Sequence, residues 1–446
     1  MPTIAPSPLR ADVVWAGTDD GYIWMTRDAA RTWHNVTPRS LTAWSKVATI
    51  EASHFDANTA YAAIDRHRLD DYRPYIYRTN DGGASWSPIA SGIPSGSFVN
   101  AVREDPQHRG LLFAGTEKGV YVSFDDGDHW QSLQRNLPVT SVRDIAIHRN
   151  DAIVATHGRA FWVMDDITPL RQLTEAAASG DAYLFAPAYA YRVQPGSQEG
   201  TPLPLDEPQV DNAPVGLYVD YYLPGAARTP VVIEIFAGDG SLVRRWSSAE
   251  PPKPVDPKSI TYTTHWIERH PVPVADAGAH RFVWDFHQDS PDGVLVPPGA
   301  YTVRLSVNGK SYTRSAEVFR DPRIAASNAD LHAQYDLARQ IVALRAEVGG
   351  SRTRAERLAK QKISPESARA LRREIIGENL PANPDDSMGA YSHDFTSFLY
   401  LGGALDYLES AVESADAAPT PDMRTAYAKL KAIYRATLAR LETMER

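Results

Sequence analysis

The sequence contains no cysteine among its 446 residues. This absence excludes structural disulfides, thiolate zinc sites and a cysteine nucleophile. The chain also lacks any block of Lys and Arg, and its formal net charge is −9 with a pI of about 5.8. Because a nucleic-acid surface needs a basic stripe, we expect no nucleic-acid partner.

Long apolar runs are missing as well. No run approaches the ~20 residues that cross a bilayer, so we expect no transmembrane segment. The N-terminal sequence MPTIAPSPLR has neither the charged nor the apolar region of a secretory signal. These absences leave the compartment open.

Familiar catalytic motifs are absent too, including the nucleophile elbow, the glycine-rich nucleotide loops and the H-E-x-x-H zinc motif. His265, Glu268 and His270 form HWIERH, but this spacing fits no zinc-protease pattern, and exposed or strand-paired polar residues are the simpler interpretation. We therefore expect no metal and no cofactor.

What the chain does contain is an internal repeat. Three segments, TRDAARTW, TNDGGASW and SFDDGDHW, share the pattern S/T-x-D-x-G-x-x-W, except that the first has Ala30 in place of Gly. A fourth, weaker copy keeps only its Asp. The residues that carry the pattern are Thr26, Asp28 and Trp33; Thr79, Asp81, Gly83 and Trp86; Ser123, Asp125, Gly127 and Trp130; and Asp165.

Each residue type in the repeat has a structural reason. Ser, Thr and Asp side chains accept hydrogen bonds from backbone N–H groups in tight turns, and Gly permits a positive φ. The Trp begins the next strand and can pack between neighbouring sheets. We therefore expect these residues to be structural and not catalytic.

Short apolar strands flank every copy at a similar spacing, so that one unit comprises four strands over about 40–50 residues, the size of a propeller blade. Four units cover about residues 2–173. In these motifs, and in phrases such as AGTEKGVYVSFDDG and THGRAFWVMDD, the segment resembles the Asp-box (BNR) repeat proteins. It is most similar to bacterial sortilin-like propellers, which are often labelled glycosyl hydrolases.

The remainder predicts two further domains. Residues 174–212 are interpreted as a linker. Alternating strands over 213–322, with the phrase VPPGAYTVRLSVNGKSY, resemble an immunoglobulin-like β-sandwich. Over 323–446 the apolar period changes to 3.6, which predicts a helical bundle. Its first helix is expected to begin near Ser327 and end at Gly349-Gly350. The fold class is therefore mainly β: a partial propeller of about four blades, a sandwich and a C-terminal helical bundle.

The densest candidate site is the insertion DRHRLDDYRPY, residues 65–75. A loop rich in Arg and aromatic residues suits a carboxylate, a peptide or a sugar; the alternative is an ion-pair loop that only stiffens its blade. Tyr75 would add a second stacking surface. The candidate ligand-binding residues are Arg66, Arg68, Asp70, Asp71, Tyr72 and Arg73.

Catalysis would need a pair of acids in a cleft between blades. The candidate acids at strand ends are Asp19, Asp20, Asp65, Asp70, Asp71, Glu104, Asp105 and Glu117. The resemblance includes sialidases, but their F/Y-R-I-P motif is absent, which disfavours that activity. Trp15, Trp24, Trp44 and Trp162 could stack on sugars, although core packing is the simpler role.

Three functions follow as expectations, and one of them is an assembly factor for a larger complex, since some small Asp-box propellers resemble such factors. The first is a sortilin-like binding or scaffold protein with a protein, peptide or carbohydrate ligand and no catalysis; the alternative is a glycoside hydrolase with a carboxylate pair. The resemblance implies an exported protein, periplasmic or extracellular. Because propellers of this kind usually have six or more blades, we also expect the missing blades to come from a longer chain or a partner, and the isolated chain to self-associate.

Overall fold

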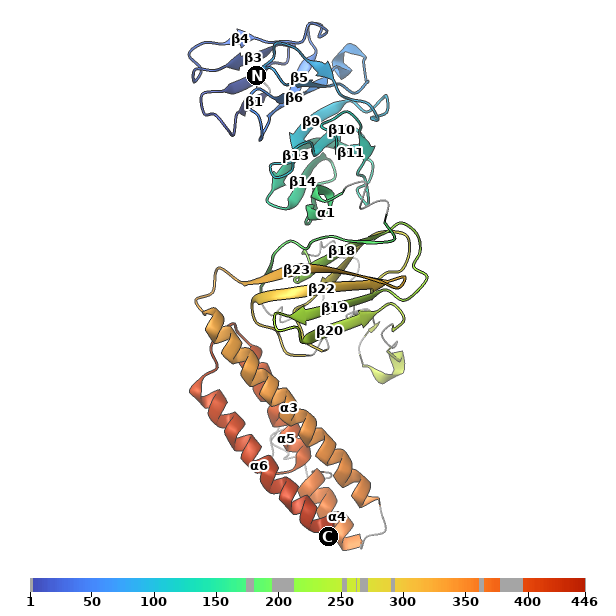
Figure 1. Ribbon diagram of the computed structural model, residues 1–446, viewed down its shortest axis with the longest axis vertical. Helices are drawn as coiled ribbons and strands as arrows, with labels where there is room; N and C mark the ends of the chain where they lie inside the picture. Colours follow the sequence, from blue (N-terminus) through green and yellow to red (C-terminus); the bar gives the residue numbers. More distant parts are fainter. Residues whose placement is uncertain are drawn as a thin grey trace. The chain divides into compact units, whose positions relative to one another are not determined.

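The computed structural model describes residues 3–173, 180–194, 212–250, 255–261, 263–264, 272–289, 293–360, 365–377 and 396–445. The protein is mainly β, with a helical C-terminal region (Figure 1). It divides into two compact units, Met1–Leu173 and Thr174–Arg446.

The first unit consists of four antiparallel sheets in chain order, in which each strand pairs with the next. The first sheet contains β1 (Thr3–Pro6), β2 (Val14–Gly17), β3 (Ile23–Thr26) and β4 (His34–Asn35). The second contains β5 (Lys46–Ala52), β6 (Ala60–Asp65), β7 (Ile76–Thr79) and β8 (Ser87–Pro88). The third contains β9 (Val99–Glu104), β10 (Leu112–Thr116), β11 (Gly119–Ser123) and β12 (Gln131–Ser132).

The fourth sheet has three strands: β13 (Ser141–His148), β14 (Asp151–His157) and β15 (Phe161–Met164). After β15 the chain forms the short helix α1 (Thr168–Arg171), where the other sheets have a fourth strand. A separate apolar core lies between each pair of successive sheets.

The second unit begins with two sheets. One contains β16 (Tyr183–Leu184), β18 (Leu217–Leu223) and β21 (Gly278–Trp284). The other contains β17 (Ala190–Arg192), β23 (Lys310–Arg320), β22 (Gly299–Val307), β19 (Val232–Ala237) and β20 (Leu242–Ser247) in that spatial order. Residues from both sheets enclose one core that contains the fully buried Trp284 and Tyr221.

Part of the expected linker therefore belongs to these sheets. β17 pairs in parallel with β23, and β16 pairs with β18. Strands of two or three residues carry too little alternation to be recognised in a sequence. Most of the rest of 174–212 lies outside the described residues, and so do His265, Glu268 and His270.

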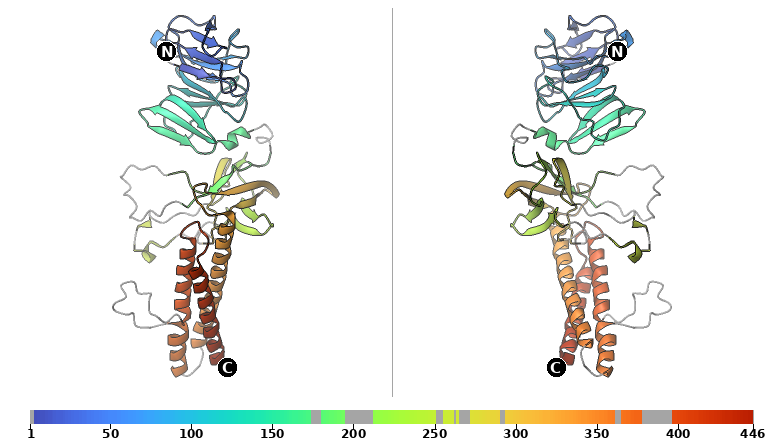
Figure 2. Two further views of the ribbon diagram at one scale, coloured as in Figure 1. Left: turned by 90° about the vertical axis from the view of Figure 1, so that its left-hand side faces the viewer. Right: turned by 90° about the vertical axis from the view of Figure 1, so that its right-hand side faces the viewer.

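The helical region contains α3 (Asn328–Ala359), α4 (Pro365–Ala370), the π-helical segment η4 (Leu371–Ile376), α5 (Phe398–Glu413) and α6 (Pro421–Glu445). Figure 2 shows α3, α5 and α6 lying side by side. The three helices enclose one apolar core. Ser327 and Asp330 form a capping box at the start of α3. The expected end at Gly349-Gly350 is wrong, because α3 continues to Ala359.

The cause of that difference is tertiary packing. Two glycines weaken an isolated helix by roughly 2 kcal/mol, but the residues after them are held by neighbouring helices. Ala355 is fully buried, and the Ser351 hydroxyl shares a hydrogen bond with the Tyr434 hydroxyl of α6 at 3.0 Å. No helix in the described part of the chain is long and apolar enough to cross a membrane.

Candidate functional site

Three turns in the first unit carry the same set of hydrogen bonds. In the second sheet the Thr79 hydroxyl donates to Asp81 at 2.9 Å and accepts from the Gly83 N–H at 2.9 Å. Asp81 then accepts from the N–H and hydroxyl of Ser85. These bonds, led by that of the Ser85 hydroxyl, lower the pKa of Asp81. The carboxylate is thereby fully occupied inside the turn.

The other two turns repeat these bonds with their own residues. Thr26 and Asp28 are bonded in the same way to Ala30 and Thr32, and the bonds lower the pKa of Asp28 to about 2. The equivalent residues of the third turn are Ser123, Asp125, Gly127 and His129. In the degenerate fourth copy Asp165 is followed by Asp166, whose N–H donates to Asp151.

The tryptophans of the repeat bridge successive sheets. The indole N–H of Trp86 donates to the carbonyl of Val36, after the first sheet, at 2.7 Å. The indole N–H of Trp130 donates to the carbonyl of Ile89, after the second sheet, at 2.6 Å. Trp33 lies at the same place in the first sheet and is 38% exposed. The tryptophans of the repeat therefore hold the second sheet to the first and the third sheet to the second.

The insertion at residues 65–75 is built around one carboxylate. Asp71 accepts two hydrogen bonds from the Arg73 guanidinium, both at 2.8 Å, and one from the Tyr75 hydroxyl at 2.8 Å. The Arg66 guanidinium lies 3.4 Å from the same carboxylate. The Arg73 bonds are the main reason why the pKa of Asp71 lies far below its usual range. Two cations thus share one anion.

Aromatic contacts fix the rest of the insertion. The guanidinium carbons of Arg66 and Arg73 lie 5.3 and 5.6 Å from the centre of the Tyr75 ring. His67, in the 3-10 turn η1 (His67–Leu69), bonds to Asp65 at 2.6 Å and stacks on Phe98 at 4.9 Å. The insertion is therefore a rigid platform whose base is anchored in the second sheet.

The platform leaves some predicted residues at its surface. Arg68 and Asp70 are exposed, Tyr72 is 50% exposed, and the Arg73 side chain is 66% exposed while bound to Asp71. Tyr72 also leans toward Phe98, with ring centres 6.3 Å apart. The structure thus brings the predicted ligand-binding residues into one segment but commits Asp71, and most of Arg66, to internal contacts.

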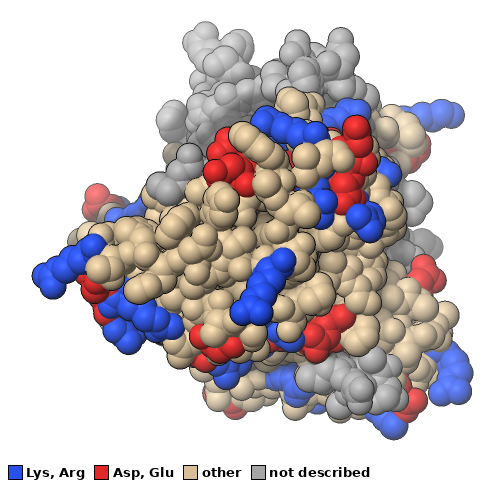
Figure 3. Space-filling view, turned by 90° about the horizontal axis from the view of Figure 1, so that it is seen from above, with Lys and Arg blue, Asp and Glu red and all other residues tan. Residues whose placement is uncertain are grey.

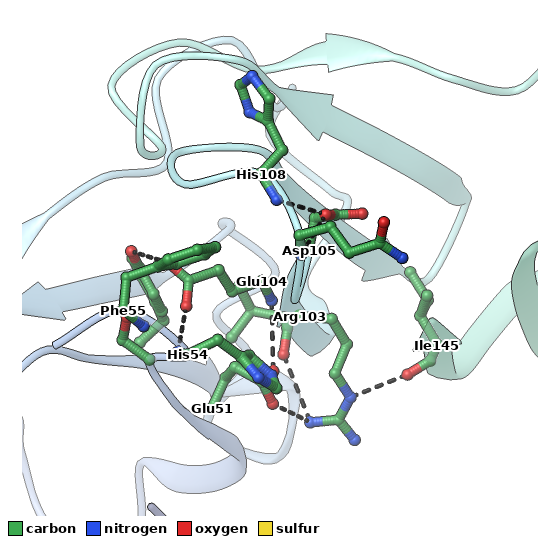
Figure 4. Close-up of polar contacts among 12 residues, drawn as sticks. Glu51, His54, Phe55, Arg103, Glu104, Asp105, His108 and Ile145 are labelled. Carbon is green, nitrogen blue, oxygen red and sulfur yellow. Dashed lines mark hydrogen bonds and ion pairs between the residues drawn. The ribbon is translucent and has the colours of Figure 1, made fainter. Parts of the chain in front are cut away.

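A second polar cluster lies between the second, third and fourth sheets (Figure 4). Glu104 is 2% exposed and accepts from the His54 N–H at 2.6 Å. Its other oxygen lies 3.2 Å from the Tyr61 hydroxyl, which is also 2.5 Å from Asp126. Because one hydroxyl proton serves only one acceptor, a protonated Glu104 satisfies both contacts. Burial raises the pKa of Glu104, which favours that protonated form.

The charged residues next to Glu104 in the sequence, Arg103 and Asp105, form ion pairs with other residues. Arg103 donates to the Ile145 carbonyl at 2.8 Å and lies within 3.3 Å of Glu51 and 2.7 Å of Asp144 (Figure 4). Asp105 is fully buried, paired with Arg171 of α1 at 2.9 Å, and accepts the N–H groups of residues 107 and 108. These contacts connect the second, third and fourth sheets.

The remaining predicted acids and tryptophans are dispersed. Asp65 is bound to His67, and Glu117 accepts from the Ser141 hydroxyl. Asp19 is exposed. Trp15 is completely buried, whereas Trp44 is 66% exposed. Trp24 and Trp162 are half-buried, Asp20 is also intermediate, and Asp70 is exposed. Among the described residues no group of three or more His, Asp or Glu side chains is arranged to hold a metal ion.

Sequence reasoning missed Tyr61, Arg78 and Asp126. Arg78 donates to both the carboxylate and the carbonyl of Asp126, at 2.9 and 2.6 Å. The available signal was that Tyr61 and Arg78 stand in strands at positions that are apolar in the other repeats.

No family model and no curated protein sequence matches this chain. Solved structures match it weakly. A structure of YCF48 bound to a D1 peptide is 18% identical, with a TM-score of 0.29, and the match covers 36% of this chain and 50% of that one. A GH74 enzyme from Niastella koreensis is 16% identical, with a TM-score of 0.29, over 36% of this chain and 22% of that one.

An ancestral GH74 enzyme is 15% identical, with a TM-score of 0.30, over 71% of this chain and 40% of that one. The chain thus spans half or less of the length of each of these structures. Similarity at this level assigns the chain to no family.

Proposed function

We propose that this chain is a sortilin-like Asp-box propeller protein that binds or scaffolds other molecules without catalysis. In this proposal residues 1–173 form about four blades, and 174–212 lead onward and add the short strands β16 and β17 to the next domain. Residues 213–322 form an immunoglobulin-like sandwich and 323–446 form a helical bundle. The repeated turn bonds and the succession of similar sheets support the blades. Two sheets around one core support the sandwich.

The observation that carries the binding function is the rigid Arg-aromatic platform of residues 65–75. Its internal bonds fix the backbone before any ligand arrives, so that little ordering cost remains for binding. Arg68 and Tyr72 project from it and are exposed, and Arg68 enters no ion pair among the described residues. A planar guanidinium and a phenol ring exposed on the same short segment suit a carboxylate attached to an apolar or aromatic group.

Charge favours an acidic peptide or protein as the ligand. Residues 65–75 contain three Arg and three Asp, so their formal charge is zero with a neutral His67. The charges are unevenly exposed, because Asp65 is 4% exposed whereas the Arg73 side chain is 66% exposed and Arg68 is exposed as well. A carboxylate-bearing peptide would meet these guanidinium groups on a protein whose net charge is −9, so the interaction should weaken as salt rises.

The test uses a fluorescein-labelled peptide of alternating glutamate and tyrosine, with anisotropy measured at low and at physiological ionic strength. The double variant Arg68→Ala/Tyr72→Ala should lose at least about tenfold in affinity, equivalent to ~1.4 kcal/mol. The matched control is Arg39→Ala/Tyr22→Ala, which removes an equally exposed pair outside the platform. Equal affinity of the two variants, or no binding by the unaltered protein, would refute the platform as a binding site.

A glycoside hydrolase is the second candidate, and one observation favours it. A general acid needs a raised pKa, and burial raises the pKa of Glu104. Against it, Glu104 is 2% exposed and both its oxygens have internal partners. Turnover of chromogenic glycosides or polysaccharides that is abolished by Glu104→Gln would establish this alternative.

A further inference from the structure

A row of three side chains recurs on one face of every sheet in the first unit. In the second sheet the row is formed by cross-strand neighbours Ile50, Ala62 and Tyr77. The equivalent rows are Val102, Ala114 and Tyr121 in the third sheet, Ile145, Val154 and Trp162 in the fourth, and Ile4, Ala16 and Trp24 in the first. We name this side of each sheet its row face and the opposite side its back face.

Every internal contact between sheets joins a row face to a back face. The row of the second sheet packs with Ala5, Trp15 and Met25 from the back face of the first. The row of the third packs with Tyr61, Ala63 and Ile76 of the second, and the row of the fourth packs with Phe113, Val120 and Val122 of the third. One mode of packing is thus used three times.

The row face of the first sheet has no preceding sheet within the described chain. Ile4 is 58% exposed, whereas the equivalent Ile50, Val102 and Ile145 are 2%, 0% and 1% exposed. Figure 3, seen from above in the orientation of Figure 1, shows a broad area of uncharged residues with Lys, Arg, Asp and Glu mostly around its edge. Trp33, which is equivalent to Trp86 and Trp130 in the next two sheets, is also exposed at 38%.

The back face of the fourth sheet is open in the same way. Phe161 is 76% exposed, while the equivalent Ile23, Ile76 and Val120 are at most 4% exposed. Val163, two residues further along β15, is 53% exposed. The unit therefore presents the two halves of its own internal contact at two separate places.

We propose that the row face of the first sheet binds the back face of the fourth sheet of a second copy of this chain, head to tail. The contact continues the packing already used three times within the unit. Such a contact joins unlike surfaces, so it closes into a ring if the rotation allows and otherwise propagates. It goes beyond the proposed ligand binding and includes no residue of the 65–75 platform.

The first turn indicates why the fourth sheet fits. A Cβ on Gly83 or Gly127 would lie 2.5 or 2.4 Å from Val36 or Ile89, which follow the fourth strand of the preceding sheet. The first sheet has Ala30 at this place, and its Cβ would meet the same obstacle from any complete four-stranded neighbour. The fourth sheet has three strands followed by α1, so it has no residue after a fourth strand that corresponds to Val36 or Ile89.

The experiment measures the mass of the full chain by sedimentation velocity over a range of concentrations. Unaltered protein should form dimers or larger species. Ile4→Asp places a charge on the row face of the first sheet alone, and Phe161→Asp places one on the back face of the fourth sheet alone. Each variant should be monomeric, because every contact between copies uses one face of each kind. Tyr407→Asp, at a 68% exposed position on α5, is the control and should associate like the unaltered protein.

Mixing the two variants gives the decisive result. Ile4→Asp keeps its back face and Phe161→Asp keeps its row face, so an equimolar mixture should form a 1:1 complex whose mass stops at two chains. A monomeric unaltered protein, continued association of either variant alone, or a mixture that stays monomeric would each overturn the proposal. Ile4→Lys and Phe161→Lys serve if either Asp variant fails to fold. Arg68→Ala/Tyr72→Ala should associate normally, which separates this outcome from that of the ligand test.

Discussion

A buried arginine joins the sheets of the second unit to its helices, and removing it should be costly. Arg192 of β17 is 1% exposed, and its guanidinium donates to the Val296 carbonyl at 2.9 Å. It also donates to Gln334 of α3 and to Asp416, which follows α5, at 2.7 Å each. The perturbation is Arg192→Met, which keeps much of the side-chain volume and removes every donor.

The magnitude follows from what the substitution leaves behind. The Asp416 side chain is 4% exposed, so without Arg192 it becomes a buried carboxylate with no cation. Breaking one side of a buried pair costs roughly 3–5 kcal/mol, far more than the pair itself contributes. Gln334 also loses its donor, although its amide still donates to the carbonyls of Val412 and Ala415. We expect a loss of about 4 kcal/mol, or a melting temperature lower by roughly 10 °C.

The assay is urea unfolding followed by far-ultraviolet circular dichroism at the helical minimum. The control is Arg245→Met, which breaks the exposed Arg245–Glu250 pair and should cost less than about 1 kcal/mol. A double variant, Arg192→Met/Asp416→Leu, should recover most of the lost stability, since no unpaired charge remains. A loss from Arg192→Met no larger than that of the control, or no recovery in the double variant, would refute the reasoning.

Four further predictions concern the first unit. Asp125→Ala should lower the free energy of unfolding by about 1–3 kcal/mol, because it leaves turn N–H groups without an acceptor. It should not alter peptide binding by the folded protein. Calorimetry measures the change in stability, and anisotropy measures peptide binding. Since hydrogen bonds lower the pKa of Asp81, its stabilising contribution should be complete above the ordinary carboxyl pKa and should disappear as pH falls through the lower folded value. Burial raises the pKa of Glu104, so the contribution of Glu104 to stability should instead be lost as pH rises through its pKa in the folded protein. Glu104→Gln should remove this pH-dependent loss. The unfolding curves of the variant at acidic and alkaline pH should therefore differ less than those of the unaltered protein. Gly127→Ala should be destabilising, because φ of Gly127 is +91° and the new Cβ would lie 2.4 Å from Ile89. Ala30→Gly should instead be neutral or stabilising by up to about 1 kcal/mol. Thermal unfolding measures both effects.

Much of the β framework could be predicted because its signal is local. Alternating apolar residues and turn residues recur at every unit, so strand positions such as β6 and β10 follow from a few neighbouring side chains. β17 could not be found in this way, because its three residues are a strand only through pairing with β23, more than a hundred positions away. The extension of α3 past Gly349-Gly350 has the same cause, since packing by α6 outweighs local propensity.

The platform was predicted only as far as composition allows. A dense run of Arg, Asp and Tyr indicates a special segment, but composition does not say which charges bind one another. The structure divides them: Asp71 holds Arg73 and Tyr75, while Arg68 and Tyr72 stay at the surface. The segment is therefore neither wholly structural nor wholly ligand-binding. The internal contacts of Asp71 hold the backbone that presents Arg68 and Tyr72 at the surface.

Comparing the repeats position by position detects what composition overlooks. Tyr61 stands where the first and third sheets have Trp15 and Phe113, and Arg78 stands where they have Met25 and Val122. At these places the second sheet exchanges apolar contacts for a polar chain that runs from Arg78 through Asp126 and Tyr61 to Glu104. A polar residue that replaces an apolar one in a repeated core is costly unless its partners are present, so each such replacement predicts another. In a repeat protein, the positions that break the repeat are thus where partners, internal or external, should be sought first.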